Sequence, residues 1–291
     1  MNTFKPHYET VAAIDLGSNS FHMIVARLDE SGTLSVIDRL RENVRLGGGL
    51  DEKGNLQEDA QERAFECLEM FAQRIRGLPQ SAVRIAGTNT LRVAKNSQQF
   101  VERAENILSH PLEIIAGREE ARLIYLGVAH GLATKEGKRL VVDIGGGSTE
   151  LIIGKGMRPQ RRESLYTGCV SASNKYFKDG IVTRKSMKAA QLNAALNLFP
   201  QVPKFNASRW DEAIGCSGTI KAIGNIVQQQ GWCSDGITYD SLKQLRSVLI
   251  ETKYIDRIEL QGLSENRKPV IAGGLSVLIA VFKLSLIHIS E

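Results

Sequence analysis

A strand–turn–strand unit that occurs twice is the sequence feature that most constrains the fold of this chain. The first copy runs from Val11-Ala-Ala-Ile-Asp-Leu16 through four small polar residues into a second apolar run at residues 21–28. The second copy is Val141-Val-Asp-Ile-Gly-Gly-Gly-Ser-Thr-Glu-Leu-Ile-Ile153, and it places Asp143 where the first has Asp15. Each copy is typical of two buried strands joined by a tight turn. The copies lie 128 residues apart, which is the size of one domain.

The order of the remaining elements predicts two α/β domains with mixed sheets. In each half, three strands are followed by helices that alternate with strands. A polar, glycine-containing segment at residues 131–138 marks the expected boundary, so we predict domains over residues 1–133 and 134–283. The last region is expected to be helical, capped by Ser264 and interrupted at Pro269 and Gly273-Gly274.

Composition and charge exclude several classes of protein. The chain is 42% hydrophobic and 24% charged, as is usual for soluble globular proteins. Its net charge of +5 is mild and accompanies no nucleic-acid-binding motif, so we expect a solvated basic surface and no specific nucleic-acid partner. No signal-peptide pattern opens the sequence, no apolar run is long enough to span a membrane, and the 4 cysteines form no C-x-x-C pair. These features predict a cytoplasmic protein with free thiols, and they leave peripheral membrane association open.

The two bends have the composition of anion-binding loops. A tight turn of small residues can present backbone N–H groups and hydroxyls to a single phosphate oxygen. Duplication alone would explain the matching apolar residues, but not a carboxylate and a hydroxyl retained at each bend. Asp15 and Asp143 are expected to be costly there, because each lies beside a buried strand. We therefore predict that the paired loops bind a phosphate chain from two sides.

Other positions also carry candidate chemistry, and each has a structural alternative. Glu119 and Glu120 open a predicted helix, where the helix dipole stabilises any carboxylate. Arg92 follows a short predicted strand and could bind a phosphate oxygen or be an ordinary surface arginine. Glu150 follows the second bend, and beside Asp143 it could hold a divalent ion.

Cys216-Ser-Gly-Thr219 is a predicted helix N-terminus, which is either a third anion site or a well-capped helix. The histidines show no metal-ligand spacing. Neither a Gly-x-Ser-x-Gly nucleophile turn nor a P-loop ending in Gly-Lys-Ser/Thr occurs. Phosphate is therefore held by the paired loops or not at all.

Five motifs follow one another along the chain: Asp15-Leu-Gly-Ser-Asn-Ser-Phe-His-Met, Thr88-Asn-Thr-Leu-Arg92, Gly117-Arg-Glu-Glu-Ala-Arg122, Asp143-Ile-Gly-Gly-Gly-Ser-Thr-Glu150 and Gly215-Cys-Ser-Gly-Thr219. Together they resemble the exopolyphosphatase / guanosine pentaphosphate phosphohydrolase family, and more closely its bacterial exopolyphosphatase branch. The resemblance covers residues 11–282. It implies a duplicated ribonuclease-H-like α/β fold of the actin, Hsc70 and sugar kinase superfamily, with the active site in a cleft between two domains.

The resemblance also implies roles for individual residues. Glu120 matches the glutamate that orients or deprotonates the attacking water, with Arg92 and Asp143 as further catalytic residues. Mg²⁺ is the implied cofactor, held by Asp143, Glu150 and Asp15. The implied phosphate-binding residues are Gly17, Ser18, Asn19, Ser20, Gly145, Gly146, Gly147, Ser148, Ser217, Gly218 and Thr219.

The implied reaction is removal of the terminal phosphate of inorganic polyphosphate by in-line attack of water. Guanosine pentaphosphate is the alternative substrate. A non-catalytic binder of polyphosphate or nucleotide is an alternative of another class, and a sugar kinase or chaperone-type ATPase is a third. Full-length members of the family commonly form homodimers.

The end of the sequence departs from the family pattern. Members continue past the helix that matches residues 270–282 into a strand, a loop and further helices, whereas residues 284–291 do not match. We expect these residues to be a foreign tail and the second sheet to lack one strand.

Overall fold

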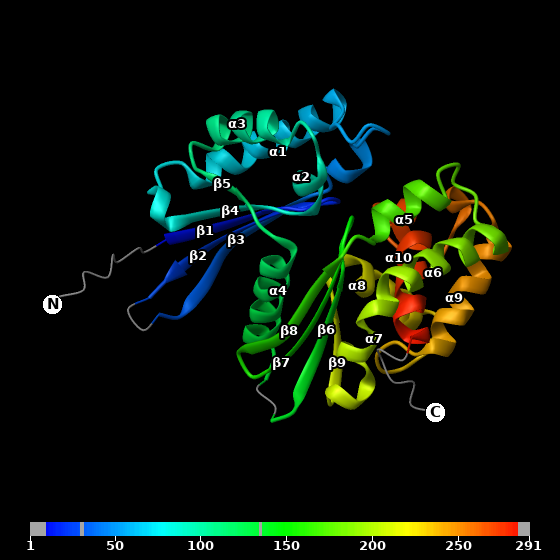
Figure 1. Ribbon diagram of the computed structural model, residues 1–291. Coiled ribbons are helices and arrows are strands. Elements are labelled where there is room, and N and C mark those ends of the chain that lie inside the picture. The colour runs from blue at the N-terminus through cyan, green and yellow to red at the C-terminus, as the bar shows by residue number, and fades with distance from the viewer. Residues whose placement is uncertain (1–9, 30–31, 134–135, 285–291) are drawn as a thin grey trace. The chain divides into compact units, whose positions relative to one another are not determined.

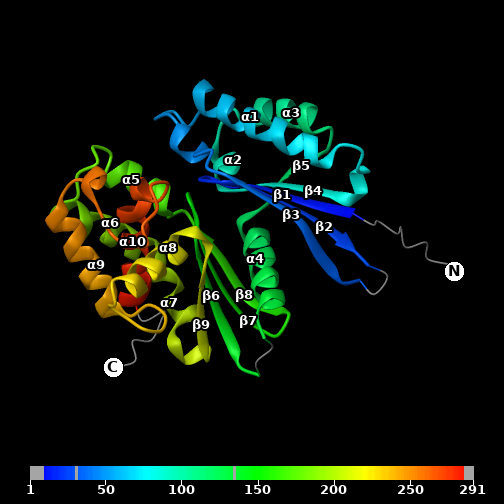
Figure 2. The same cartoon turned by 180° about the vertical axis from the view of Figure 1, so that it is seen from behind.

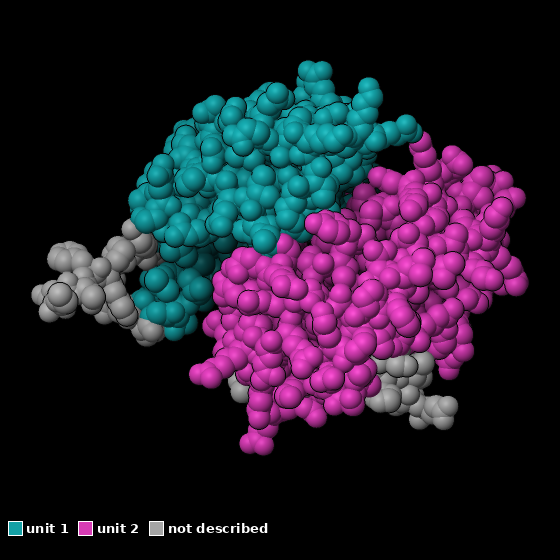
Figure 3. All heavy atoms as spheres, viewed as in Figure 1, with its two compact units in different colours: residues 1–116 teal, residues 117–291 magenta. Residues whose placement is uncertain are grey.

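The chain divides into two compact units, Met1–Ala116 and Gly117–Glu291 (Figure 3). The computed structural model describes residues 10–29, 32–133 and 136–284, so all of the expected tail except Leu284 lies outside the described residues. The division falls before α4 (Gly117–Gly131), whereas the sequence placed this helix at the end of the first domain. Ala121 and Tyr125 of α4 are buried in a cluster with residues of the second sheet, which explains its membership of the second unit.

The first unit contains a five-stranded mixed sheet in the order β3-β2-β1-β4-β5. β1 pairs antiparallel with β2 and parallel with β4; β2 pairs antiparallel with β3, and β4 parallel with β5. The strands are β1 (Thr10–Leu16), β2 (Phe21–Leu28), β3 (Leu34–Glu42), β4 (Val83–Gly87) and β5 (Leu112–Ile114).

Helices α1 and α3 lie over one face of this sheet in both views (Figures 1 and 2). Ile14 and Leu16 of β1 and Leu68 and Phe71 of α1 belong to one buried cluster, which lies entirely within the first unit. The helical segments of the unit are η1 (Leu46–Gly49), α1 (Glu58–Ile75), η2 (Gln80–Ala82), α2 (Asn89–Val93) and α3 (Ser97–Leu108).

Burial alternates along β1, and this corrects one expectation. Ile14 and Leu16 point into the core, so Asp15 between them points to the other face and is exposed. The carboxylate of Asp15 therefore bears no cost of burial within its own unit, contrary to the sequence prediction.

The second unit contains a four-stranded sheet in the order β8-β7-β6-β9, within the part of the chain that the structure describes. Its strands are β6 (Lys138–Ile144), β7 (Thr149–Lys155), β8 (Arg158–Leu165) and β9 (Glu212–Cys216). Both faces are covered: Val141 and Ile152 pack with α4, while Leu140 and Val142 pack in the large core on the other face. Figures 1 and 2 show α4 on one side of the sheet and the remaining helices on the other.

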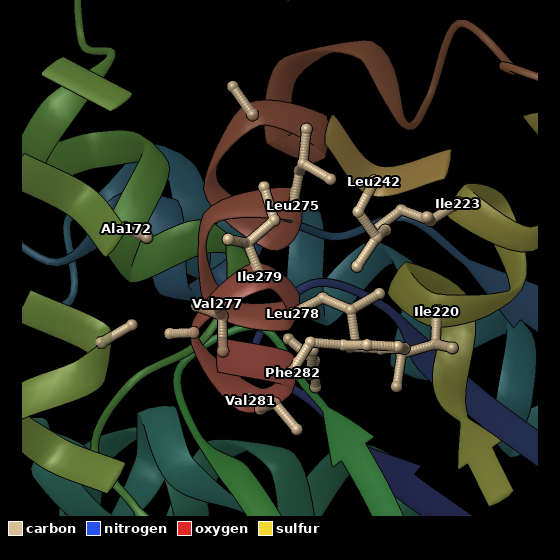
Figure 4. Packing of buried hydrophobic residues seen from close by; sticks show 14 of the residues in the cluster. Ala172, Ile220, Ile223, Leu242, Leu275, Val277, Leu278, Ile279, Val281 and Phe282 are labelled. Carbon is tan, nitrogen blue, oxygen red and sulfur yellow. The ribbon is translucent and has the colours of Figure 1, made fainter. Parts of the chain in front are cut away.

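Helix α10 lies at the centre of those remaining helices. Every residue from 270 to 282 is buried, as expected for a helix that is apolar on all sides. Figure 4 shows side chains of α10, among them Leu275 and Leu278, packed with Ile220 and Ile223 of α8 and Leu242 of α9. The helical segments of the unit, besides α4, are α5 (Cys169–Tyr176), α6 (Arg184–Leu198), η3 (Phe199–Gln201), α7 (Val202–Phe205), η4 (Ala207–Arg209), α8 (Ser217–Gln229), α9 (Tyr239–Thr252), η5 (Ile255–Arg257) and α10 (Lys268–Lys283).

The predicted interruptions of α10 are wrong. The helix runs unbroken through Gly273 and Gly274, and its N-cap is Arg267, with Pro269 in the first turn where proline is tolerated. A Cβ on Gly273 would overlap the carbonyl oxygen of Cys169 and lie 2.7 Å from the backbone nitrogen of Ser173. The two glycines therefore permit close helix packing and do not break the helix.

The predicted duplication is confirmed in the register of the two sheets. Asp15 lies opposite His22 across the β1–β2 pair, and Asp143 lies opposite Glu150 across β6–β7. In both units the first two strands are antiparallel and the first strand also pairs in parallel with a later strand, β4 or β9. None of the helices described is long and apolar enough to cross a membrane.

Candidate active site

Three carboxylates come together in the second unit. Asp143 and Glu150 face each other on neighbouring strands, and Glu120 lies in the first turn of α4. Glu150 is only 1% exposed, and its Oε1 accepts a hydrogen bond of 2.7 Å from Ser164 Oγ. The sequence predicted Asp143 and Glu150 as neighbours, and placed Glu120 at a helix start; the structure confirms both positions.

Burial raises the pKa of Glu150 well above its ordinary value, and the nearby charges of Glu120 and Asp143 raise the pKa further. Burial also raises the pKa of Asp143, while hydrogen bonds from Cys216 and Ser217 act in the opposite direction. Carboxylates with perturbed pKa values that lie together are common at functional sites. Their mutual repulsion makes this cluster receptive to a cation or a proton.

Glu119, the neighbour of Glu120, has a structural role. Its carboxylate accepts bonds of 2.9 Å from Arg122 Nε and 2.7 Å from Arg122 Nη2, and this hydrogen bonding lowers the pKa of Glu119. The structural alternative considered for the helix start therefore holds for Glu119. Glu120 is the residue whose charge acts on Glu150.

Asp143 accepts a hydrogen bond from Cys216, the N-cap residue of α8. Cys216 lies beside Asp143 on β9, and its thiol donates to Asp143 Oδ2 over 3.3 Å. Ser217 has a left-handed backbone, with φ of 71°, and its hydroxyl donates to the carbonyl oxygen of Ile144 over 2.9 Å. A non-glycine residue in this conformation is strained, so the segment is held in place by its surroundings.

Arg267, the N-cap of α10, lies against the start of α8 and was not predicted as a site residue from the sequence. A Cβ on Gly218 would overlap the guanidinium group of Arg267, so that group lies directly against the N-terminal turn of the helix. Thr219, in the same turn, is 4% exposed. A helix N-terminus with an adjacent arginine favours an anion. The only sequence signal was a basic residue before Lys268-Pro269, which is too common to be informative.

The glycine loop at residues 145–148 is hydrogen-bonded to the first residues of α5. The N–H of Gly145 donates to the carbonyl oxygen of Ser148 over 2.9 Å, which closes the turn. The carbonyl of Gly145 accepts from Cys169 N at 2.9 Å, and that of Gly146 from Val170 N at 2.8 Å. Ser148 is 3% exposed.

The first loop, residues 17–20, lies in the other unit. Ser18, Asn19 and Ser20 are all less than a tenth exposed, and Ser20 Oγ lies 3.0 Å from Asn43 Oδ1. Asn19 Oδ1 is buried without a hydrogen-bond partner among the described residues. An unpaired buried acceptor of this kind calls for an explanation, such as a ligand or a water.

Arg92 and Asp15 also belong to the first unit. Arg92 lies on α2, and its Nη1 donates to the carbonyl oxygen of Ile115 over 2.9 Å. This bond fixes the side chain at the end of the sheet. The roles predicted for Arg92 and Asp15 stay predictions.

The donor chemistry of the second unit fits a hard divalent cation. Asp143 and Glu150 provide oxygen ligands on adjacent strands, and Mg²⁺ is usually held by one or two carboxylates together with substrate phosphates and waters. Among the described residues, no group of three or more His, Cys, Asp or Glu side chains has the arrangement of a metal site. Asp143 and Glu150 could supply two of the oxygen ligands of such a cation.

The repeated sheets and their paired loops define a duplicated, ribonuclease-H-like α/β protein. A model of one family of such proteins matches residues 24–291, and the chain belongs to that family, the Ppx/GppA phosphatase family.

Among curated proteins, the chain is 43% identical over 283 residues to the guanosine-5'-triphosphate,3'-diphosphate pyrophosphatase of Aliivibrio fischeri, covering 97% of this chain and 56% of the relative. It is 42% identical over 273 residues to the protein of the same name from Vibrio vulnificus, covering 94% of this chain and 54% of that protein. The chain thus spans about half the length of the curated relatives that it matches.

Solved structures agree with the fold. An exopolyphosphatase-like protein superposes with a TM-score of 0.83 at 26% identity, covering 95% of this chain and 89% of that one. The Ppx/GppA family member of Aquifex aeolicus superposes with a TM-score of 0.73 at 28% identity, covering 95% and 90%.

Proposed function

We propose that this chain carries the catalytic site of a phosphoanhydride hydrolase. The observation that carries the proposal is the cluster of Glu120, Asp143 and Glu150, in which Glu120 lies close enough to raise the pKa of Glu150. Hydrolysis of a phosphoanhydride needs a positioned water and charge neutralisation more than a protein nucleophile. A carboxylate beside a phosphate-binding loop can position the water.

In the proposed reaction, Glu120 orients a water for in-line attack on the terminal phosphorus and takes up its proton. As the water oxygen bonds to the phosphorus, the bond from that phosphorus to the bridging oxygen breaks, and the shortened phosphate chain leaves with the bridging oxygen. The backbone of residues 145–148 and the start of α8 bind the oxygens of the phosphate chain. Arg267, against Gly218, adds positive charge at the same helix end. The first loop and Arg92 stay proposed phosphate-binding residues of the first unit.

Asp143 and Glu150 are the residues that would hold Mg²⁺. Bound there, the cation would supply charge against the oxygens of the transferred phosphoryl group. Cys216 keeps the Asp143 carboxylate in place by hydrogen bonding. Asp15, predicted from the sequence as a metal ligand, stays a proposal for the first unit.

The proposed substrate is guanosine 5'-triphosphate 3'-diphosphate, cleaved at its terminal 5'-phosphoanhydride. This order of candidates reverses the sequence analysis, which placed inorganic polyphosphate first. The reason is the 42–43% identity to relatives named for the nucleotide; the exopolyphosphatase-like structure is 26% identical. Polyphosphate stays the second candidate, because the same cluster would serve both.

The test is release of phosphate from the two substrates, measured side by side with Mg²⁺ present. Glu120→Gln is expected to lower the rate by about 10²- to 10⁴-fold, the usual contribution of a general base. The thermal midpoint should stay within a few degrees of the parent. A Glu120→Gln protein as fast as the parent would refute the role of Glu120.

Glu119→Gln is the matched control, because it changes the adjacent carboxylate, which is already bound by Arg122. This variant should retain most of the activity. Tight binding of either substrate by the parent, without Mg²⁺-dependent phosphate release, would instead indicate a non-catalytic binder.

A further inference from the structure

The carbonyl groups of both phosphate loops are hydrogen-bonded to a segment that follows the third strand of the unit. In the first unit this segment follows β3, and in the second it follows β8. We propose that these two segments are backbone braces that turn the N–H groups of each loop toward bound phosphate. The proposal rests on the proposed function, and it assigns positioning residues that no motif identifies.

The first brace consists of Asn43, Arg45 and Gly47. The N–H of Arg45 donates to the carbonyl oxygen of Asn19 over 2.9 Å, and the N–H of Gly47 donates to that of Ser18 over 2.8 Å. Arg45 adopts a left-handed backbone, with φ of 54°, to make this turn. Such a conformation is unfavourable for a non-glycine residue, so other interactions hold the segment against the loop.

The second brace is residues 168–171, at the start of α5. Cys169 N donates to the carbonyl oxygen of Gly145 over 2.9 Å. The carbonyl of Gly146 accepts from Val170 N at 2.8 Å and from Ser171 N at 3.2 Å. Gly146 is the counterpart of Ser18 in the duplication, so the same loop position is tied in both units.

The geometry of the peptide bond explains what the braces do. In a trans peptide, the C=O of one residue and the N–H of the next point in opposite directions, and the described chain contains no cis bond. Tying the carbonyls of Ser18 and Asn19 to one side therefore turns the next two N–H groups to the other side. The same holds for the N–H groups of Gly146 and Gly147.

Each brace depends on a glycine at its closest approach. A Cβ on Gly47 would lie 2.9 Å from Thr90 Oγ1 and 3.1 Å from the Cβ of Ser18. A Cβ on Gly168 would lie 2.6 Å from the carbonyl carbon of Gly146 and 2.7 Å from Gly147 N, which are backbone atoms that cannot rotate away. An alanine at Gly168 must displace the backbone of the loop. An alanine at Gly47 must push Thr90 Oγ1 aside and crowd Ser18, whose Cβ and carbonyl oxygen lie within 3.2 Å.

Gly48 provides a matched control within the same segment, since a Cβ there would meet nothing within 4 Å. Gly47→Ala is expected to raise KM by about tenfold, because small displacements of binding groups have effects of this order or larger. Gly48→Ala should keep the parent KM. A partial loss of folded protein would lower the rate at every substrate concentration and leave KM unchanged. Equal KM values for the two variants would overturn the first brace.

Gly168→Ala tests the second brace, with Gly127→Ala on the exposed side of α4 as its control. The expected result is again a raised KM for Gly168→Ala alone. If Gly47→Ala fails to fold, Asn43→Ala replaces it, because this change removes the side chain to which Ser20 Oγ donates and adds no atom against the loop. A parental KM in Asn43→Ala and in Gly168→Ala would contradict the proposal.

A binding measurement separates failure of the braces from failure of the proposed function. Inorganic tripolyphosphate is added to ¹⁵N-labelled protein, and the amide signals of Asn19, Ser20, Gly146 and Gly147 are followed. All four should shift in the parent, and those of Asn19 and Ser20 should shift less in Gly47→Ala.

This outcome would support the braces even if the parent released no phosphate from either substrate, which would refute only the proposed function. Identical shifts in parent and variant would overturn the first brace. Loop amides that do not respond in the parent would overturn both braces.

Discussion

Glu150 is the residue whose environment has the clearest energetic consequence. It is buried beside two other carboxylates, so its charged form is disfavoured and its pKa lies well above the ordinary value. A group whose pKa is raised on folding destabilises the folded state at every pH where the unfolded chain would be ionised. The carboxylate is therefore retained at a cost, as is expected for a residue kept for function and not for stability.

Glu150→Gln is expected to stabilise the metal-free protein at neutral pH. The thermal midpoint should rise by about 3 °C or more, the change that roughly 1 kcal/mol produces in a unit of this size. The gain should vanish as the pH falls toward the ordinary pKa of glutamate, because Glu150 is then protonated in both states. Midpoints measured from pH 4 to pH 8 in a chelating buffer test this, and a pH-independent difference would contradict it.

Binding of a divalent cation to the Glu150 carboxylate should stabilise the folded state, whereas the unbound carboxylate destabilises it. Mg²⁺ that binds only the folded state stabilises it by mass action, and Asp143 and Glu150 are its proposed ligands. Added Mg²⁺ should therefore raise the thermal midpoint of the parent more than that of Glu150→Gln. Na⁺ at matched ionic strength serves as the control, and equal shifts in the two proteins would exclude Glu150 as a ligand.

Among the elements, α10 shows how packing can override local sequence signals. Glycine pairs usually favour a kink or an end of a helix, yet α10 continues through Gly273 and Gly274. The reason lies in α5 and α8, which approach so closely that only a hydrogen fits at these positions. A single sequence does not reveal that approach, because the contacting residues are about 50 and 100 positions away.

Gly273→Ala is expected to destabilise the protein by about 1–3 kcal/mol, the usual cost of overpacking a core. Gly127→Ala in α4 is the control, since its Cβ would meet nothing within 4 Å and alanine favours a helix by up to about 1 kcal/mol. Urea unfolding of both variants measures the difference. A stabilising Gly273→Ala would show that the close approach of α5 and α10 is not required.

The strands and loops were the elements that the sequence predicted best. Alternating or continuous apolar runs with small residues at the bends specify a strand pair locally, so β1, β2, β6 and β7 were anticipated within a residue or two. The position of Arg267 against Gly218 could not be anticipated, because it depends on how α8 and α10 pack. The exposure of Asp15 was missed for a similar reason: it depends on which face of the sheet the helices cover.

At the scale of the whole molecule, each unit has a hydrophobic core of its own. The members of the largest buried cluster of the first unit all lie between residues 12 and 112, and those of the second unit all lie between residues 140 and 282. The sequence located both domains through the duplicated loops, but it assigned α4 to the first. Only the buried contacts of Ala121 and Tyr125 reveal that this helix belongs to the second sheet.

Separate cores predict separate unfolding. A fragment of residues 1–116 and one of residues 117–291 should each unfold cooperatively on heating, because a domain with its own core can fold alone. Circular dichroism at a range of temperatures tests this for each fragment. A fragment without a cooperative transition would show that its core needs the other unit.

The two braces have a consequence for how sequences of this kind diverge. Their hydrogen bonds to the loop carbonyls run from backbone to backbone, so most side chains along them can be exchanged without loss of the contacts. Selection would be visible where a Cβ cannot be accommodated, at Gly47 and Gly168, and at Asn43, whose side chain accepts from Ser20 Oγ. Two distant sequences could therefore share this support of the phosphate loops while matching at little more than a glycine in each half.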